Sequence, residues 1–251
     1  MIDLVGDYLR QATSRLEAIA GMARDGGLDS AVTLMSEAIA EGGVIQAFGT
    51  GHSEAFAMEI AGRAGGLIPT NRIALRDVVL HGRRDASELG GSALERDPEV
   101  VDELFAVSPI SPADVFIIAS NSGVNGSIVG VALKAKELGH AVIAVTSVQH
   151  TNAVEPKHPS GRRLSEIADV VIDNLAPYGD ATLELPGGIG IGAISSITAA
   201  FIAQLLTLGV AERMAAAGGT PPVYISANIP GGDEHNHALE DLYRDRIRRD
   251  A

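Results

Sequence analysis

The stretch VIQAFGTGHSEAFAMEIAGRAG, residues 44–65, decides how this chain is expected to fold. It begins with a short apolar run, continues through a turn rich in glycine and hydroxyl residues, and ends in a helix-forming segment. This order predicts a strand, a tight loop and a helix. The first backbone N–H groups of a helix have no partner within it, and the helix dipole favours negative charge there, so the loop is a candidate phosphate site.

A second stretch, VFIIASNSGVNGSIVGVALKAKEL at residues 115–138, repeats the pattern with Ser120, Ser122 and Asn125 in its turn. Two such loops predict one anion held from two sides. Neither is a nucleotide motif, because the first lacks the lysine of a P-loop and the third glycine of the dinucleotide fingerprint. A lone glycine turn often serves only to turn the chain, so the prediction depends on the pair.

The alternation of strands and helices predicts an α/β fold with a parallel sheet. Further strands are expected at residues 67–75, 141–146 and 170–173, and the runs VFIIAS and AVIAVT show no polar alternation. Parallel strands read this way because helices cover both faces of the sheet, and ligands bind at the carboxyl ends of the strands. Both glycine-hydroxyl loops are expected at that edge.

Composition excludes several classes of protein. The chain has 251 residues, 46% of them hydrophobic, and a formal charge of −13, which argues against nucleic acid as a partner. It has no cysteine, so disulfides and thiolate sites are excluded. No uninterrupted apolar run has the length of a membrane span, and acidic residues within the first 20 positions are unlike a signal peptide. We therefore expect a cytoplasmic protein without a membrane partner.

Three further segments have patterns that predict their structure. A nearly uncharged helix is predicted at residues 194–217, and a helix that is apolar almost all round belongs to a core or a subunit interface. Residues 147–163, with His150 and His158, are predicted to be irregular, and their spacing fits no compact metal motif. His235 and His237 near the end of the chain are predicted to lie in a capping turn rather than in a metal site.

The order GTGHS, SNSGVN, AVIAVTS and IADVVID resembles the sugar isomerase (SIS) domain, whose members bind phosphosugars. The resemblance implies a three-layer αβα sandwich with a mostly parallel five-stranded sheet. It implies one SIS domain over residues 1–251, with a core at about 43–217, helices in 1–42 and a tail in 218–251. By resemblance, the phosphate-contacting positions are Gly51, His52, Ser53, Ser120, Asn121, Ser122 and Asn125. Asn125 stands where the family usually has threonine, and the histidine at 52 is a departure from the family's first loop.

The resemblance favours an aldose-ketose isomerase. In that reaction a carboxylate moves a proton between adjacent carbons through an enediol while a second group opens the sugar ring, and neither a metal nor a cofactor is required. Two alternatives remain open. One is a phosphosugar-binding sensor or regulator without turnover. The other is a phosphosugar lyase similar to N-acetylmuramic acid phosphate etherase, although its catalytic carboxylates have no clear match here.

Glu59 is the predicted base and His81 the predicted ring-opening acid. Glu59 has apolar neighbours, and a partly desolvated carboxylate suits a general base near neutral pH. An ion pair with Arg63 four residues later is the alternative. In the isomerase domain of glucosamine phosphate synthase, which this region resembles, a glutamate matches Glu59 and a histidine matching His81 reaches the neighbouring subunit's site. That enzyme's own base falls at Gly66, so Glu184 is kept in reserve.

We also expect a homodimer or a dimer of dimers. The apolar helix at residues 194–217 and the amphipathic N-terminal helices present more apolar surface than one face of a sheet covers. SIS domains commonly pair in this way.

Overall fold

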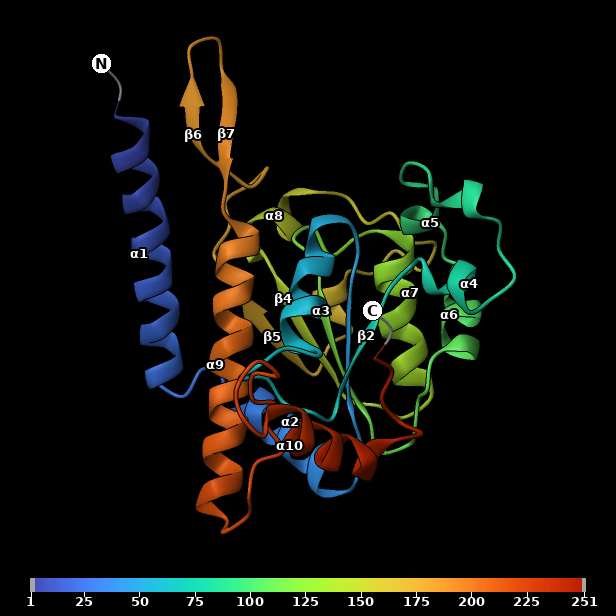
Figure 1. Ribbon diagram of the computed structural model, residues 1–251. Coiled ribbons are helices and arrows are strands. Elements are labelled where there is room, and N and C mark those ends of the chain that lie inside the picture. Colours follow the sequence, from blue (N-terminus) through green and yellow to red (C-terminus); the bar gives the residue numbers. More distant parts are fainter. Residues whose placement is uncertain (1–2, 250–251) are drawn as a thin grey trace.

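The computed structural model describes residues 3–249, and a five-stranded parallel sheet forms its centre (Figure 1). The strand order is β2-β1-β3-β4-β5, with bounds β1 Ile45–Gly49, β2 Thr70–Ile73, β3 Val115–Ala119, β4 Val142–Thr146 and β5 Val170–Asp173. Strands β1, β3 and β4 are buried at every residue because helices cover both faces. The predicted α/β fold with a three-layer arrangement is confirmed.

The order in which the chain adds strands to the sheet reverses between β1 and β3. From β1 the chain crosses to β2 on one side, and later strands run from β3 to β4 and β5 on the other. Strands β1 and β3 are neighbours whose last residues, Gly49 and Ala119, pair with each other. The loops that follow them therefore start side by side at the carboxyl edge, and such a switch point is where open α/β sheets bind ligands.

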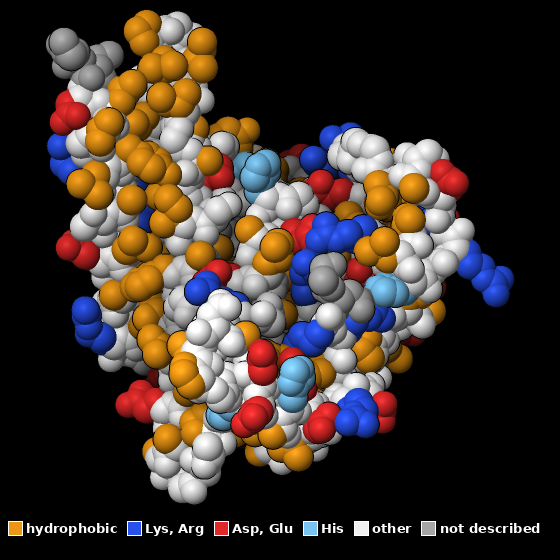
Figure 2. Space-filling model, in the orientation of Figure 1, with side chains coloured by type: hydrophobic (Ala, Val, Ile, Leu, Met, Phe, Trp, Pro, Cys, Tyr) orange, Lys and Arg blue, Asp and Glu red, His pale blue; other side chains and the backbone are white. Residues whose placement is uncertain are grey.

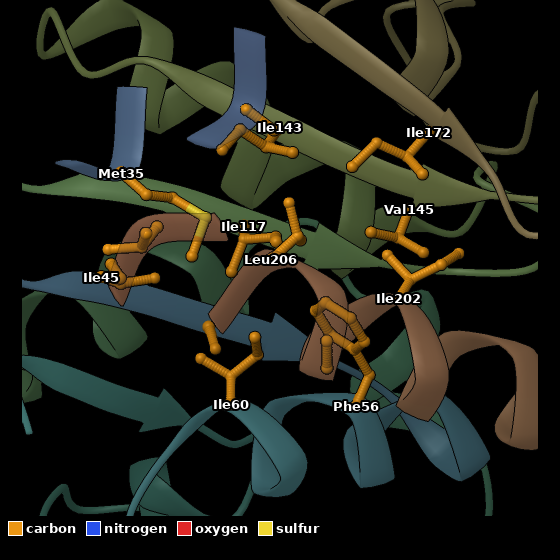
Figure 3. Packing of buried hydrophobic residues seen from close by; sticks show 14 of the residues in the cluster. Met35, Ile45, Phe56, Ile60, Ile117, Ile143, Val145, Ile172, Ile202 and Leu206 are labelled. Atoms are coloured by element: carbon orange, nitrogen blue, oxygen red, sulfur yellow. The ribbon is translucent and has the colours of Figure 1, made fainter. Parts of the chain in front are cut away.

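One face of the sheet is covered by α2 (Asp29–Ala40), α3 (Glu54–Ile60) and α9 (Ser195–Ala216). Phe56 and Ile60 of α3 pack with Ile202 and Leu206 of α9 over Ile117 of the sheet (Figure 3). Helix α1 (Leu4–Arg24) contacts the outer side of α9 (Figure 1). This layer fixes α3 and α9 against each other, with the starts of both helices at the carboxyl edge of the sheet.

The other face is covered by α6 (Val100–Val107) and α7 (Gly126–Glu137). Phe105 of α6 stacks on Phe116 of β3, with ring centroids 5.5 Å apart. Short helices α4 (Asp77–Leu80) and α5 (Ala93–Arg96) and the 3₁₀ turn η2 (Ala86–Leu89) connect β2 to α6. The 3₁₀ turns η1 (Gly51–Ser53), η3 (Leu164–Glu166) and η4 (Asp241–Tyr243) complete the short elements.

Two segments differ from the sequence-based prediction, and a third was not predicted. The stretch predicted to be irregular contains α8 (Val148–Ala153), which begins where the Ser147 side chain accepts a hydrogen bond from the His150 amide. The glycine-rich region before α9 forms an antiparallel hairpin of β6 (Ala181–Leu185) and β7 (Ile189–Ala193). The predicted capping turn around His235 and His237 is wrong, because both residues lie within α10 (Gly232–Glu240).

Helix α9 confirms the predicted apolar helix but is not fully covered. It is long and apolar enough to cross a membrane by length and composition, which is weak evidence because core helices pass the same test. One side packs on α2 and α3, while Leu208 on another side is 63% exposed. Hydrophobic side chains also extend along α1 and the β6–β7 hairpin beside it (Figure 2).

Candidate functional site

The first glycine-hydroxyl loop leaves β1 at Gly49 and turns through η1 into α3. A Cβ on Gly49 would lie 2.3 Å from the Ser53 carbonyl oxygen, so only glycine fits here. Gly51 has a φ of +55°, a conformation that side chains disfavour. The turn is closed by the Ser53 amide, which donates to the Thr50 carbonyl at 3.1 Å. The glycines thus bring Ser53 back over the end of the strand.

The second loop leaves β3 and likewise turns at a glycine before a helix. Gly123 has a φ of +63°, and its amide donates to the Ser120 hydroxyl at 3.1 Å. Ser120 is buried at the end of the strand, and α7 begins directly after Asn125. The prediction that both loops lie at one edge of the sheet is therefore confirmed.

A small polar hollow lies between these loops and the start of α9, which we call the cradle. Four of the predicted phosphate-binding residues line it: His52, Ser53, Ser120 and Asn121. Its other polar lining residues, Asn174, Ser195 and Ser196, were not predicted. Gly51, Ser122 and Asn125 belong to the two loops but do not line the cradle.

Asn174 orients the second loop from the neighbouring strand. It follows β5 directly and is 3% exposed. Its side-chain Nδ2 donates to Oδ1 of Asn121 at 3.1 Å, while its Oδ1 accepts from the Ala176 amide at 2.9 Å. The bond from Ala176 fixes the Asn174 side chain, which in turn holds Asn121 in the cradle.

Asp180 fixes the start of α9 at the cradle. Its carboxylate accepts from the amides of Ile194 and Ser195 at 3.1 and 2.8 Å and from the Ser195 hydroxyl at 2.7 Å. Asp180 itself has a φ of +65°, which aspartate tolerates better than most residues. The cradle is thus bounded by the starts of two helices, α3 and α9, and by the loop that leads into a third, α7, whose dipoles favour an anion there.

Glu95 of α5 contacts the second loop, and sequence reasoning missed it. Its Oε1 accepts from Asn125 Nδ2 at 2.5 Å, and its backbone carbonyl accepts from the Ser127 hydroxyl at 2.8 Å. A Cβ on Gly51 would lie 3.9 Å from its Oε2. Glu95 therefore places a negative charge at the start of α7, where the helix dipole favours it.

Glu59 lies on α3, two turns beyond Ser53. Its Oε1 accepts from Gln204 Nε2 of α9 at 2.6 Å and forms an ion pair with Arg63. The i,i+4 pair that was the alternative interpretation is thus present in the structure. Because Phe56 of the cradle lies one turn earlier on the helix, Glu59 continues the same face of α3 along the seam with α9.

The other two catalytic candidates lie elsewhere in the chain. His81 follows α4 and lines a second cavity, beside β2. Glu184 is exposed on the β6–β7 hairpin. Neither lines the cradle, and Glu59 does not line it either, so the cradle contains none of the three catalytic candidates.

His150 supports the segment that leads to Asp180. Its ring stacks on Tyr178, with centroids 5.1 Å apart, and its Nδ1 accepts from the Gly179 amide at 3.0 Å. Burial lowers the pKa of His150; Asp180 opposes this shift and Lys157 adds to it. The histidine is thus favoured in the neutral form that accepts this hydrogen bond. In the part of the chain that the structure describes, no group of three or more His, Asp or Glu residues could hold a metal ion.

Comparison with known proteins gives a consistent result. The family model described as SIS domain matches residues 7–147. The UPF0309 protein GK1441 of Geobacillus kaustophilus is 35% identical over 245 residues, covering 97% of this chain and 96% of the relative. The UPF0309 protein lin2794 of Listeria innocua is 40% identical over 214 residues, 85% of each chain.

Solved structures share the fold at low sequence identity. A phosphoheptose isomerase from Francisella tularensis has a TM-score of 0.55 and 17% identity, covering 84% of this chain and 100% of that chain. A phosphoheptose isomerase from Neisseria gonorrhoeae has a TM-score of 0.51 and 19% identity, covering 82% of this chain and 96% of that one. At these identities the likeness shows the fold alone.

Proposed function

The chain belongs to the SIS domain family, and on that premise we propose that it binds a phosphorylated sugar at the cradle and interconverts the aldose and ketose forms of that sugar. The observation that carries the proposal is the convergence of polar side chains and helix starts at the switch point of the sheet. Ser53, Asn121 and Ser196 come from three different elements and line one hollow. The two phosphoheptose isomerases named above have the same fold.

The cradle suits a phosphate in spite of the acidic chain. Among the residues that the structure describes, its lining includes no lysine or arginine. Hydroxyl and amide donors with helix dipoles act at short range, and a hydrogen bond to a charged group contributes about 1.5–3 kcal/mol. Charges more than about 8 Å away are screened at physiological salt, so the net charge of −13 does not oppose binding directly.

We assign the proton transfer to Glu59. Glu59 follows Ser53 and Phe56 of the cradle along α3, and Gln204 of α9 orients its carboxylate. The carboxylate takes the proton from the carbon next to the carbonyl and returns it to the neighbouring carbon, so that no redox partner is needed. His81 is the proposed ring-opening acid, acting on the site of a second subunit, and Glu184 remains the reserve base.

The test is exchange of deuterium from solvent into a panel of sugar phosphates. Wild type should incorporate deuterium at the carbon next to the carbonyl and convert one of the sugars. Glu59→Gln should bind that sugar phosphate but lose exchange by at least a hundredfold. Glu95→Gln is the matched control, because it removes a carboxylate beside the loops but outside the seam, and it should retain exchange. Loss of exchange in Glu95→Gln alone would transfer the role of base to Glu95.

A second candidate function is a phosphosugar-binding sensor without turnover. The observation that favours it is the engagement of one Glu59 oxygen by both Arg63 and Gln204, which occupies the carboxylate. In that case wild type binds a sugar phosphate in titration calorimetry, and no sugar in the panel exchanges deuterium. The dephosphorylated sugar should bind poorly under either function.

We further propose a homodimer or a dimer of dimers that covers the apolar face of α1, α9 and the hairpin. Val5, Leu9 and Leu208 are 82%, 64% and 63% exposed on these helices. Light scattering at micromolar concentration should give twice or four times the mass of one chain, and Leu9→Asp combined with Leu208→Asp should shift the protein to monomer. A monomeric wild type contradicts this assembly.

A further inference from the structure

A second cavity, of about 460 Å³, lies on the other side of α3 from the cradle. On that side it is lined by Met58 and Gly62, whereas the cradle is lined by Ser53 and Phe56 of the opposite face. Strand β2, helix α4 and the C-terminal segment form its other walls. We call it the β2 cavity. Its volume is in the range of small-molecule sites.

Positive charge dominates the lining of the β2 cavity. Within residues 3–249 it is lined by five arginines together with His81 and one carboxylate, Asp77; the arginines are Arg63, Arg72, Arg76, Arg248 and Arg249. Figure 2 shows several basic side chains gathered on one face of the molecule. A cluster of this kind is unexpected in a chain with a net charge of −13.

Carboxylates of neighbouring elements lie beside these arginines. Glu54 serves two arginines, pairing with Arg76 and lying 3.9 Å from Arg72. Glu59 pairs with Arg63. Asp77 lies 3.7 Å from Arg248, and Glu240 lies 4.0 Å from Arg249. Glu54 therefore divides one negative charge between two guanidinium groups.

Arg249 forms a fixed part of the cavity wall. Its guanidinium donates to the carbonyls of Ile68 and Thr70 at 2.6 and 2.8 Å and to the Tyr224 hydroxyl at 2.6 Å. Burial and the Glu240 hydrogen bond raise the pKa of Tyr224 to about 12, so it meets Arg249 as a neutral phenol. Carbonyl and phenol partners orient the guanidinium, and the Glu240 carboxylate lies 4.0 Å from it.

The rim of the cavity is adjustable. The side chains of Arg63 and Arg76 are 47% and 39% exposed, and each is held by a single glutamate. Exposed ion pairs of this kind contribute at most about 1 kcal/mol. These guanidinium groups can therefore turn from their glutamates to a bound anion at little cost, and guanidinium binds phosphate oxygens through two parallel hydrogen bonds.

We propose that the β2 cavity is a second ligand site, for a small phosphorylated metabolite that carries two or more negative charges, such as a diphosphate. It is separate from the cradle and differs from it in chemistry, since it recognises charge through arginine. A ligand there contacts α3 on the side of Met58, and it also meets Arg63, which is the ion-pair partner of the proposed base Glu59.

The experiment is titration calorimetry with inorganic pyrophosphate on the full chain at low salt. Wild type should bind, and Arg72→Gln combined with Arg76→Gln should weaken the affinity at least tenfold. Ser53→Ala, which alters only the cradle, should leave this event unchanged. Arg10→Gln combined with Arg244→Gln removes the same charge from exposed positions elsewhere and should also leave it unchanged.

The conservative variant separates binding from support of the fold. Arg76→Lys keeps the charge and should retain most of the pyrophosphate affinity. If the double variant fails to fold, Arg63→Gln on the rim gives the same test with one exposed side chain. The proposal is overturned if the arginine variants bind pyrophosphate like wild type, or if Ser53→Ala abolishes all pyrophosphate binding, which would make the cradle the sole anion site.

Discussion

The two faces of α3 offer an anion two different environments. On one face the cradle presents hydroxyls, amides and helix starts, with no basic residue among its described lining. On the other face the β2 cavity presents five guanidinium groups. Hydrogen bonds from neutral donors depend on geometry and weakly on salt, whereas attraction between exposed charges falls as salt rises. We therefore propose that this acidic chain binds one anion through neutral hydrogen-bond donors on one side of α3 and another through arginines on the other side.

Gly49→Ala should have the largest effect on phosphosugar binding at the cradle. The new Cβ would lie 2.3 Å from the Ser53 carbonyl oxygen, which is backbone, so the turn must move. Overpacking of this kind costs about 1–3 kcal/mol of stability. Phosphosugar affinity should fall at least a hundredfold in calorimetry, while pyrophosphate binding at the β2 cavity should persist.

Gly21→Ala is the matched control for that variant. Gly21 lies within α1, and an added Cβ meets nothing within 4 Å. Alanine in a helix interior is favoured over glycine by about 0.5–1 kcal/mol, so urea unfolding should show a small gain in stability and unchanged affinity. Normal phosphosugar binding by Gly49→Ala would show that the cradle does not depend on this turn.

A smaller effect is expected from Asp180→Ala, which tests whether the start of α9 supports the cradle. The substitution removes the acceptor of two backbone amides and one hydroxyl, and loss of a helix cap costs about 0.5–2 kcal/mol. Urea unfolding should show that loss, and phosphosugar affinity should fall several-fold because Ser195 and Ser196 lose their support. Asp180→Asn, which caps helices and tolerates the left-handed backbone, should recover most of both. Equal losses in the two variants would contradict the capping role.

The cradle and the β2 cavity also differ in how far the sequence predicts them. The cradle is built from main-chain turns at the ends of strands, and Gly49, Gly51 and Gly123 mark those turns in the sequence. The strand order then brings the two loops together through one rule of parallel sheets. His52, Ser53, Ser120 and Asn121 were therefore predictable as neighbours.

The remaining features depend on long-range packing. Asn174 and Ser196 enter the cradle because β5 and α9 end and begin at the same edge, and no local pattern distinguishes them from other polar residues. The arginines of the β2 cavity lie at positions as distant as 63 and 249, and the C-terminal segment meets β2 through the Asn71 side chain. The β6–β7 hairpin was missed because its glycines indicate turns rather than strands.

The smallest expected effect is a pH dependence of the folding stability that arises from His150. Burial holds the pKa of His150 below its ordinary value of 6.5, so in the window between the two values the folded state binds fewer protons than the unfolded state. Stability must then rise with pH across this window and fall as the pH drops below about 6.5. Protonation of Nδ1 also removes the acceptor of the Gly179 amide, next to Asp180.

His150→Asn should therefore flatten the dependence of the unfolding free energy on pH below about 6.5, measured by urea unfolding. His158→Asn is the control, because burial also lowers the pKa of His158 but its ring bonds Ser160, away from the cradle. Both variants should reduce the slope, whereas only His150→Asn should also weaken phosphosugar binding at about pH 7.5, where the wild-type ring is neutral and accepts from Gly179. Unchanged affinity in His150→Asn would show that the path from α8 through Asp180 to the start of α9 does not support the cradle.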